Sequence, residues 1–314
     1  IYLKTVSASA NLNYQGGTHS YAMEWYFVPN HVKTLKSYGI GLEELVPLGW
    51  SIIGWINKYI VINIFNYFET WGLNYGMIIL LMALLIKIAL FPFTYKSYTS
   101  MAKMRVLKPQ IDAINDKYED QMKRQQETMA LYSQTGVSPL GGCIPMLFQM
   151  PILFALFRFF PASIELRQQG FLWATDLSTY DSIFDLGFSI PFYGDHISLF
   201  TLLMTATTVL QMKFSNSISS SNAQMPQMKY MMYFMPVIFL GVMNNYAAAL
   251  SYYYFLANLI TFAQQKMIAG MTDDSALLAK MEAKKEITPK KGKSKFQVRL
   301  EKMMKEQQEA KRKK

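Results

Sequence analysis

A single charged side chain, Lys87, interrupts the apolar run from Leu73 to Thr94. A charge at the centre of a membrane-spanning helix costs about 3 kcal/mol on insertion scales. Either the flexible stem of Lys87 carries its ammonium group to water near Thr94, or the ammonium group lies in a water-filled cavity where it can bind an acidic group. Both alternatives require that the apolar run crosses a membrane.

Polar side chains also occur in the other apolar stretches of the chain: Gln149, Gln211, Tyr254 and Asn258. A single polar residue in a membrane span usually joins two helices by a hydrogen bond, so each one alone says little. Taken together with Lys87, the set predicts a hydrophilic groove between helices. Its positive charge would come from Lys87.

The sequence lacks the residue patterns of the common catalytic and metal sites. It contains no Ser/His/Asp set, no paired carboxylates and no glycine-rich phosphate loop, and His19, His31 and His196 are scattered. Cys143 is the only cysteine, which excludes an internal disulfide and a cysteine pair for zinc or redox chemistry. We therefore expect no enzyme activity, no metal and no cofactor.

Five apolar stretches are candidates for membrane spans and define a core over residues 71–268. They are Leu73–Thr94, Leu140–Ala162, Ile197–Phe214, Gln227–Met243 and Ala247–Ile268. Each should be helical, because lipid offers no partners to unpaired backbone groups. The fourth would be about 25 Å long against a hydrocarbon core of about 30 Å, so it should thin the bilayer locally.

The distribution of lysine and arginine orients these spans, within a net charge of +10. The loop at residues 95–138 is basic, whereas the loop from Ser163 to His196 has Arg167 as its only basic residue beside five acids. The positive-inside rule places the basic loop in the cytoplasm and the acidic loop outside. The amino-terminal segment should therefore lie outside and the carboxyl terminus inside.

Two segments precede the core. Residues 1–45 are polar and strand-like, with an aromatic and β-branched run from Tyr21 to Val28, and we expect them to be the end of a larger β domain outside the membrane. Residues 46–70 have apolar side chains at helical spacing, with Trp50, Trp55 and Tyr59 among them. This predicts an amphipathic helix lying flat on the bilayer, with a helix of a soluble core as the alternative.

The basic loop at residues 95–138 has the pattern of a helical hairpin. Met101 and Met104 lie on a helical stripe of its first arm with Leu107, Ile111 and Ile114, and Met122 and Met129 mark its second arm; Arg105 is a further candidate contact residue. Methionine suits an adaptable contact surface, although such a stripe is more often simply packed. Pro109 should kink or interrupt the first arm.

The last segment, residues 269–314, is rich in lysine and arginine and poor in aromatic and β-branched residues. We expect it to be disordered or to form a lone solvated helix. Its charge predicts a polyanionic partner. Ribosomal RNA and anionic lipid both fit, and the sequence does not choose between them.

Several motifs resemble those of the YidC/Oxa/Alb family of membrane protein insertases, most closely its bacterial YidC members. They are Tyr98–Arg105, Leu107–Pro109, Pro139–Pro145, Gln149–Pro151, Phe234–Val237, and Tyr253-Tyr254 with Asn258-Leu259. The match runs from about Val46 to Ile268. The opening piece, including Tyr26–Pro29, looks like the end of the periplasmic β-sandwich of the Gram-negative members.

The resemblance implies an all-α polytopic protein of the bacterial inner membrane, with five helices around a hydrophilic groove open to the cytoplasm and the lipid. It also implies a mobile cytoplasmic hairpin, and nascent membrane proteins, the ribosome and the Sec translocon as partners. Lys87 takes the place of an arginine that is usual in the bacterial members, which keeps the charge but loses the planar fork. The function expected is insertion of transmembrane segments. The rival hypothesis is a small-ion or solute transporter that uses Lys87 as its binding charge.

Overall fold

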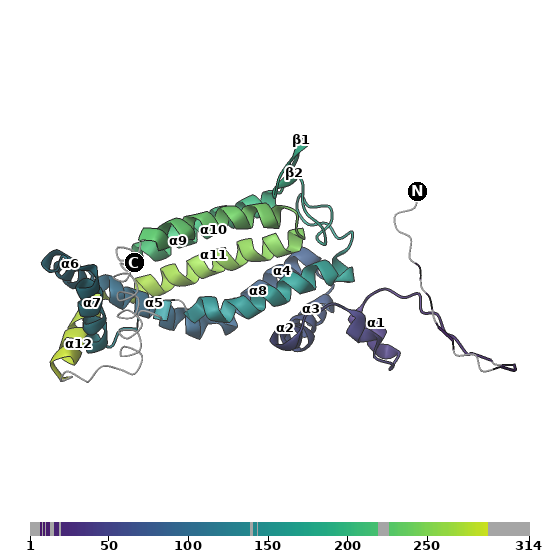
Figure 1. Cartoon of the computed structure of the whole chain (residues 1–314), viewed down its shortest axis with the longest axis horizontal. Helices are drawn as coiled ribbons and strands as arrows, with labels where there is room; N and C mark the ends of the chain where they lie inside the picture. The colour runs from purple at the N-terminus through teal and green to yellow at the C-terminus, as the bar shows by residue number, and fades with distance from the viewer. Residues whose placement is uncertain are drawn as a thin grey trace.

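The computed structural model describes residues 7, 9, 11–12, 16–18, 20–138, 141–142, 144–218 and 226–287, without the side chains of residues 144–146, 216–218, 226–233 and 284–287. Its long helices run side by side in a bundle (Figure 1). These helices are α4 (Tyr75–Ala89), α8 (Ile144–Ala162), α9 (Leu199–Ile218), α10 (Pro226–Asn244) and α11 (Ala248–Met271). Helix α11 contacts α4, α8 and α9 and so forms the centre of the bundle.

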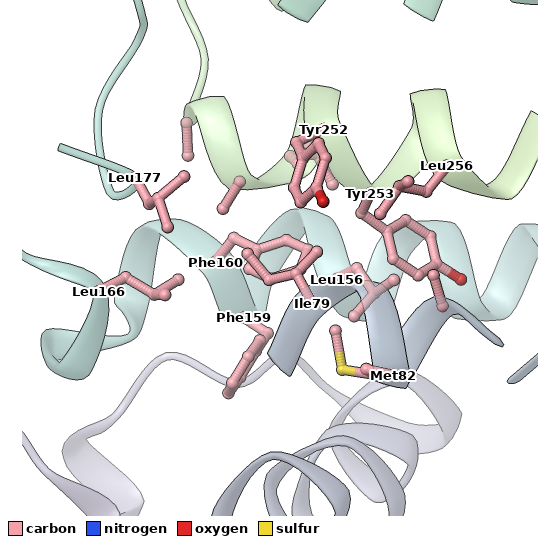
Figure 2. Packing of buried hydrophobic residues seen from close by; sticks show 14 of the residues in the cluster. Ile79, Met82, Leu156, Phe159, Phe160, Leu166, Leu177, Tyr252, Tyr253 and Leu256 are labelled. Atoms are coloured by element: carbon pink, nitrogen blue, oxygen red, sulfur yellow. The ribbon is translucent and has the colours of Figure 1, made fainter. Parts of the chain in front are cut away.

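The bundle is held together by closely packed apolar and aromatic side chains. Figure 2 shows Tyr252, Tyr253 and Leu256 of α11 close to Leu156 and Phe160 of α8. Tyr253 and Phe160 are completely buried. Because lipid tails are as apolar as these side chains, contacts of this kind, rather than exclusion of water, hold helices together in a bilayer.

The first expected span is not one straight helix. Helix α4 ends at Ala89, and α5 (Phe91–Val106) continues at an angle of 58° to it. Pro92 is in the first turn of α5, where its missing N–H group is tolerated, whereas its ring would clash within a continuous helix. The expectation of an unbroken span from Leu73 to Thr94 was therefore wrong. Lys87 lies in the last turn of α4.

The other four expected spans are helical where the structure describes them, with boundaries close to those expected. Judged by length and apolar composition alone, none of the described helices would cross a membrane singly; α4 and α5 would do so together, as a bent pair. The apolar parts of α8 and α10, Leu147–Ala162 and Phe234–Asn244, are shorter.

The expected amphipathic helix is present in three consecutive parts, α2 (Ser51–Ile56), the π-helical segment η2 (Asn57–Val61) and α3 (Ile62–Glu69). Phe65 and Phe68 are on its buried face. Asn57 ties it to α8, because its side-chain amide donates to the carbonyl of Ala155 at 2.8 Å. The opposite face exposes large aromatic and apolar side chains: Trp50, Ile52, Trp55, Tyr59, Ile60 and Tyr67.

The segment before this helix contains no strand among its described residues. The run from Tyr21 to Val28 has no regular secondary structure and is followed by α1 (Val32–Ser37) and the 3-10 turn η1 (Leu42–Leu45). A lone strand leaves its backbone groups unpaired, and the described residues offer this run no partner strand. The strand expected from its composition is thus not seen. Its place at the end of a β domain stays a prediction.

Strands occur instead at a place where none was expected. After the turn η4 (Ile164–Leu166), β1 (Phe184–Ile190) pairs antiparallel with β2 (Gly194–Ile197). The fold is therefore mostly helical rather than all-α. We call this end of the bundle, with β1, β2 and the start of α9, the β end (Figure 1).

The opposite end holds a second apolar cluster. It is built by α5, α6 (Lys108–Lys117), α7 (Gln121–Thr135), the last turns of α11, and α12 (Asp274–Ile287). Pro109 opens α6 after a break at Leu107, which confirms the expected interruption. The start of the basic tail is not a lone solvated helix, because α12 packs on α5 and α7 through Leu277 and Met281. Residues 288–314 lie outside the described residues.

Candidate functional site

Lys87 is buried in the bundle, with 8% of its surface exposed. Its ammonium group donates a hydrogen bond to Oε1 of Gln149 on α8 at 3.1 Å. None of the ion pairs among the described residues includes Lys87. A buried charge is costly unless it is paired, and no acidic partner of Lys87 is found among the described residues.

Two tyrosines of α11 complete the surroundings of Lys87. The hydroxyl groups of Tyr253 and Tyr254 are buried without a hydrogen-bond partner among the described residues. The side chain of Gln149 lies close to both hydroxyl groups. We call Lys87, Gln149, Tyr253 and Tyr254 the lysine cluster. It joins α4, α8 and α11 and brings one ammonium group and two hydroxyl groups together.

Two further amide side chains, Gln264 and Gln265, were not predicted as site residues. Gln264 is close to the lysine cluster, and Gln265 follows it along α11. The side chain of Gln264 donates to the backbone carbonyl of Lys87 at 3.1 Å. Its Oε1 atom and that of Gln265 are buried and unpaired among the described residues. Both residues could have been identified from the sequence, because they are two adjacent glutamines near the end of an apolar stretch.

Asn258 and Gln211 were both expected in the groove, and Asn258 is hydrogen-bonded to α9. The side-chain amide of Asn258 donates to the hydroxyl of Thr208 at 2.8 Å and is 3.3 Å from that of Thr207, so it links α11 to α9. Gln211 is half-buried on α9, and it follows Thr207 by four residues, on the same side of the helix. For Asn258 this geometry favours the helix-joining alternative. A groove role for either residue stays a prediction.

The expected contact residues of the hairpin mostly face inward. Met101 and Met104 are buried in the second apolar cluster, Met129 packs against it, and Met122 is half-buried. Arg105 instead forms an ion pair with Asp274 of α12, at 2.7 Å and 2.9 Å to the two carboxylate oxygens. Partial burial alone would lower the pKa of Arg105, but the hydrogen bond and charge of Asp274 raise it.

The β end also buries polar groups, but there they are paired. The carboxylate of Asp181 accepts hydrogen bonds from the backbone of Leu199 and Phe200 at 2.9 and 3.1 Å, from Trp173 at 2.8 Å, and from the hydroxyl of Ser198. It thereby caps the first turn of α9. The other members of this β-end network, each with a partner, are His196, Thr201, Asn244 and Ser251.

The described residues contain no group of three or more His, Cys, Asp or Glu side chains that could hold a metal ion. In the β-end network the hydroxyl of Ser198 donates to the carboxylate of Asp181, and both side chains are buried. The chemistry available at the lysine cluster is the binding of an anionic or hydrogen-bonding group.

Comparisons with known proteins identify the family. A family model described as 60Kd inner membrane protein matches residues 66–275. Relatives named membrane protein insertase YidC are 50% identical in Bacteroides fragilis, over 98% of this chain and 52% of that protein, and 40% identical in Porphyromonas gingivalis, over 99% and 52%. The chain thus spans about half the length of the curated relatives it matches.

A solved structure gives the same result for the fold. The crystal structure of an active YidC insertase with its first transmembrane domain resolved matches 75% of this chain and 53% of its own, at 26% identity and a TM-score of 0.52. The fold is therefore the mostly helical YidC-like fold, with a small two-stranded hairpin. By the span of the family match and the identity to these relatives, the chain belongs to the 60Kd inner membrane protein family, the family of YidC.

Proposed function

We propose that this chain inserts transmembrane segments of newly made proteins from the cytoplasm into the inner membrane. The observation that carries the proposal is the lysine cluster, where a buried ammonium group has a neutral amide and no acid as its partner. Membership of a family whose curated relatives are named insertases supports it. The charge of Lys87 would be available to an acidic group of the incoming segment.

We infer that the bundle crosses the membrane with α4, α8, α9, α10 and α11. The basic segment of α5, α6 and α7 would lie in the cytoplasm and the β end outside, as the distribution of lysine and arginine favours. The exposed aromatic face of α2 and α3 fits a helix lying on the bilayer surface. Residues 1–45 would belong to a β domain outside the membrane.

Insertion in this scheme needs no bond chemistry. A carboxylate that displaces Gln149 from Lys87 replaces an ammonium–amide hydrogen bond with an ion pair, which adds the attraction between opposite charges. The polar leading segment can then move part of the way across in contact with polar groups. The following apolar segment leaves sideways into lipid, so the apolar barrier that the leading segment must cross becomes shorter.

The test is insertion by Lys87 variants in vesicles that contain the purified protein. A single-span substrate with an acidic leading segment should be inserted less efficiently by Lys87→Ala, whereas Lys87→Arg, which keeps the charge, should insert it nearly as well as the unchanged protein. Lys213→Ala, at an exposed position of α9, is the matched control. Protease protection of the leading segment measures insertion.

Equal protection by Lys87→Ala and the unchanged protein, over several acidic substrates, would contradict the proposal. It would favour the alternative in which the stem of Lys87 only carries its ammonium group to water. The same vesicles test the transporter hypothesis. A transporter would move ions or solutes through the protein in the absence of any substrate protein, and Lys87→Ala would abolish that flux.

The ribosome, the Sec translocon and anionic lipid remain proposed partners, supported by the basic composition of residues 269–314. Removal of residues 288–314 should weaken co-sedimentation with ribosomes and flatten its salt dependence if ribosomal RNA is bound, because each phosphate contact releases a counterion. If anionic lipid is bound instead, the loss should appear in binding to charged vesicles.

A further inference from the structure

The hairpin of β1 and β2 exposes three phenylalanine side chains, two in β1 and one in the turn that follows it. Phe192 is 96% exposed, and Phe184 and Phe188 are 61% and 63% exposed. The seven residues from Phe188 to Gly194, which we call the aromatic tip, contain no charged side chain. A contiguous exposed apolar surface of this kind usually marks a binding site for protein or lipid.

The aromatic tip is fixed to the bundle. The backbone carbonyl of Tyr193 accepts hydrogen bonds from the side chains of Asn244 and Asn245 at 3.0 and 2.6 Å. The carbonyl of Phe192 lies against Gly241 of α10, so closely that a Cβ atom there would be 3.0 Å away. Phe192 is thus presented outward from a held backbone.

The backbone of Phe192 is in the left-handed region, at φ 68°. A bulky residue other than glycine is rare in this conformation. Such a conformation persists where the surrounding contacts impose it, often at a site of function. Glycine adopts this backbone conformation more easily than phenylalanine. The presence of phenylalanine at residue 192 therefore indicates that its side chain contacts a partner.

The apolar surface of the tip continues onto α10. Gly241, which the tip touches, precedes Val242, and Val242 and Ile238 are about half exposed, at 48% and 47%. Figure 1 shows β1 and β2 projecting away from the ends of α9 and α10, across the bundle rather than along it. In the membrane placement proposed above, this puts the tip over the lipid beside α10, at the outer surface of the bilayer.

We propose that the aromatic tip inserts Phe188 and Phe192 into the outer leaflet and so anchors the β end to lipid beside α10. The partner is the lipid surface itself. Uncharged apolar and aromatic side chains beside a membrane-spanning helix favour the interfacial zone of a bilayer. The inference depends on the membrane placement of the bundle and not on insertion activity.

Spin labelling tests the proposal in vesicles of phosphatidylethanolamine and phosphatidylglycerol that contain the purified protein with Cys143→Ser. Labels at Phe192→Cys and at the control Asp185→Cys, an exposed acid of β1, are compared for collisions with oxygen, which concentrates in lipid, and with a water-soluble nickel complex. We expect the ratio of oxygen to nickel collisions to be several-fold higher at residue 192. Phe188→Cys repeats the test if Phe192→Cys does not fold, because its backbone has no positive φ.

A tip label as accessible to nickel as the control would overturn the proposal, since the tip would then be in water. Protection from both reagents, together with spin–spin broadening that grows with protein density, would also overturn it. That outcome would mean that a second copy of the chain covers the tip. Loss of insertion activity in any of these variants would not affect the reading of the collision data.

Discussion

The lysine cluster and the β-end network bury polar groups in opposite ways. At the β end, Asp181 accepts four hydrogen bonds, and the hydroxyl of Thr201 is bonded to its neighbours. In the lysine cluster, the hydroxyls of Tyr253 and Tyr254 are unpaired among the described residues, and Lys87 has only an amide as partner. A saturated network fixes a structure, whereas an unsaturated one is suited to water or a ligand. The comparison favours a stabilising role for the β end and agrees with the binding role proposed for the lysine cluster.

The largest expected effect is at Asp181. Asp181→Ala removes the acceptor of four donors, and because buried donors are then left unpaired, the protein should lose about 3 kcal/mol of stability. Thermal unfolding in detergent, followed by circular dichroism, measures the loss. Asp185→Ala, which removes an exposed acid of the same loop, is the control and should leave the unfolding temperature unchanged. Equal unfolding temperatures for Asp181→Ala and the control would show that Asp181 and its hydrogen bonds do not stabilise the protein.

The second apolar cluster extends the comparison, since its helix α12 is attached by the apolar side chains of Leu277 and Met281 and by one exposed ion pair. Met281 is 3% exposed, and Met281→Ala should weaken the docking of α12 by about 2 kcal/mol. Arg105→Ala breaks a surface ion pair with Asp274, worth about 0.5 kcal/mol. Hydrogen exchange of the α12 amides should therefore accelerate much more in Met281→Ala. The reverse order would mean that charge rather than packing holds α12.

A matched pair of hydroxyl deletions gives the smallest effects and the sharpest contrast. Thr201→Val leaves paired neighbours without a partner and should cost about 1 kcal/mol of stability with little effect on insertion. Tyr254→Phe removes a hydroxyl with no partner among the described residues, so stability should hold while insertion of acidic substrates falls. Unfolding temperature and protease protection, measured on both variants, check the pair. A destabilised Tyr254→Phe with normal insertion would reverse the assignment.

Much of this arrangement could be predicted from sequence, and the failures have physical causes. Helical spans and the break at Pro109 follow from apolar length and from proline geometry. The bend before Pro92 was missed because hydropathy does not register a missing N–H group. The strands β1 and β2 were missed because Gly187, at φ 74°, and an irregular register interrupt the alternation of side chains that indicates a strand.

The lysine cluster could be predicted from the sequence only in part. The rarity of charge in an apolar run identified Lys87, and Gln149 proved to be its hydrogen-bond partner. Spacing along one helix, however, does not say which neighbouring helix a side chain will face. The hydrogen bond from Asn258 to α9 could therefore not be foreseen, and the docking of α12 through Met281 could not be deduced from the composition of a basic tail.

The central claim is that the lysine cluster meets water from the cytoplasm while the β-end network is closed, and thiol labelling tests it most directly. Gln149→Cys and Thr201→Cys, each in a protein with Cys143→Ser, are treated in vesicles with a water-soluble maleimide, which reacts with the hydrated thiolate. The account predicts that the thiol at residue 149 reacts many times faster than the thiol at residue 201, and from the cytoplasmic side. Equally slow reaction at both positions would contradict it.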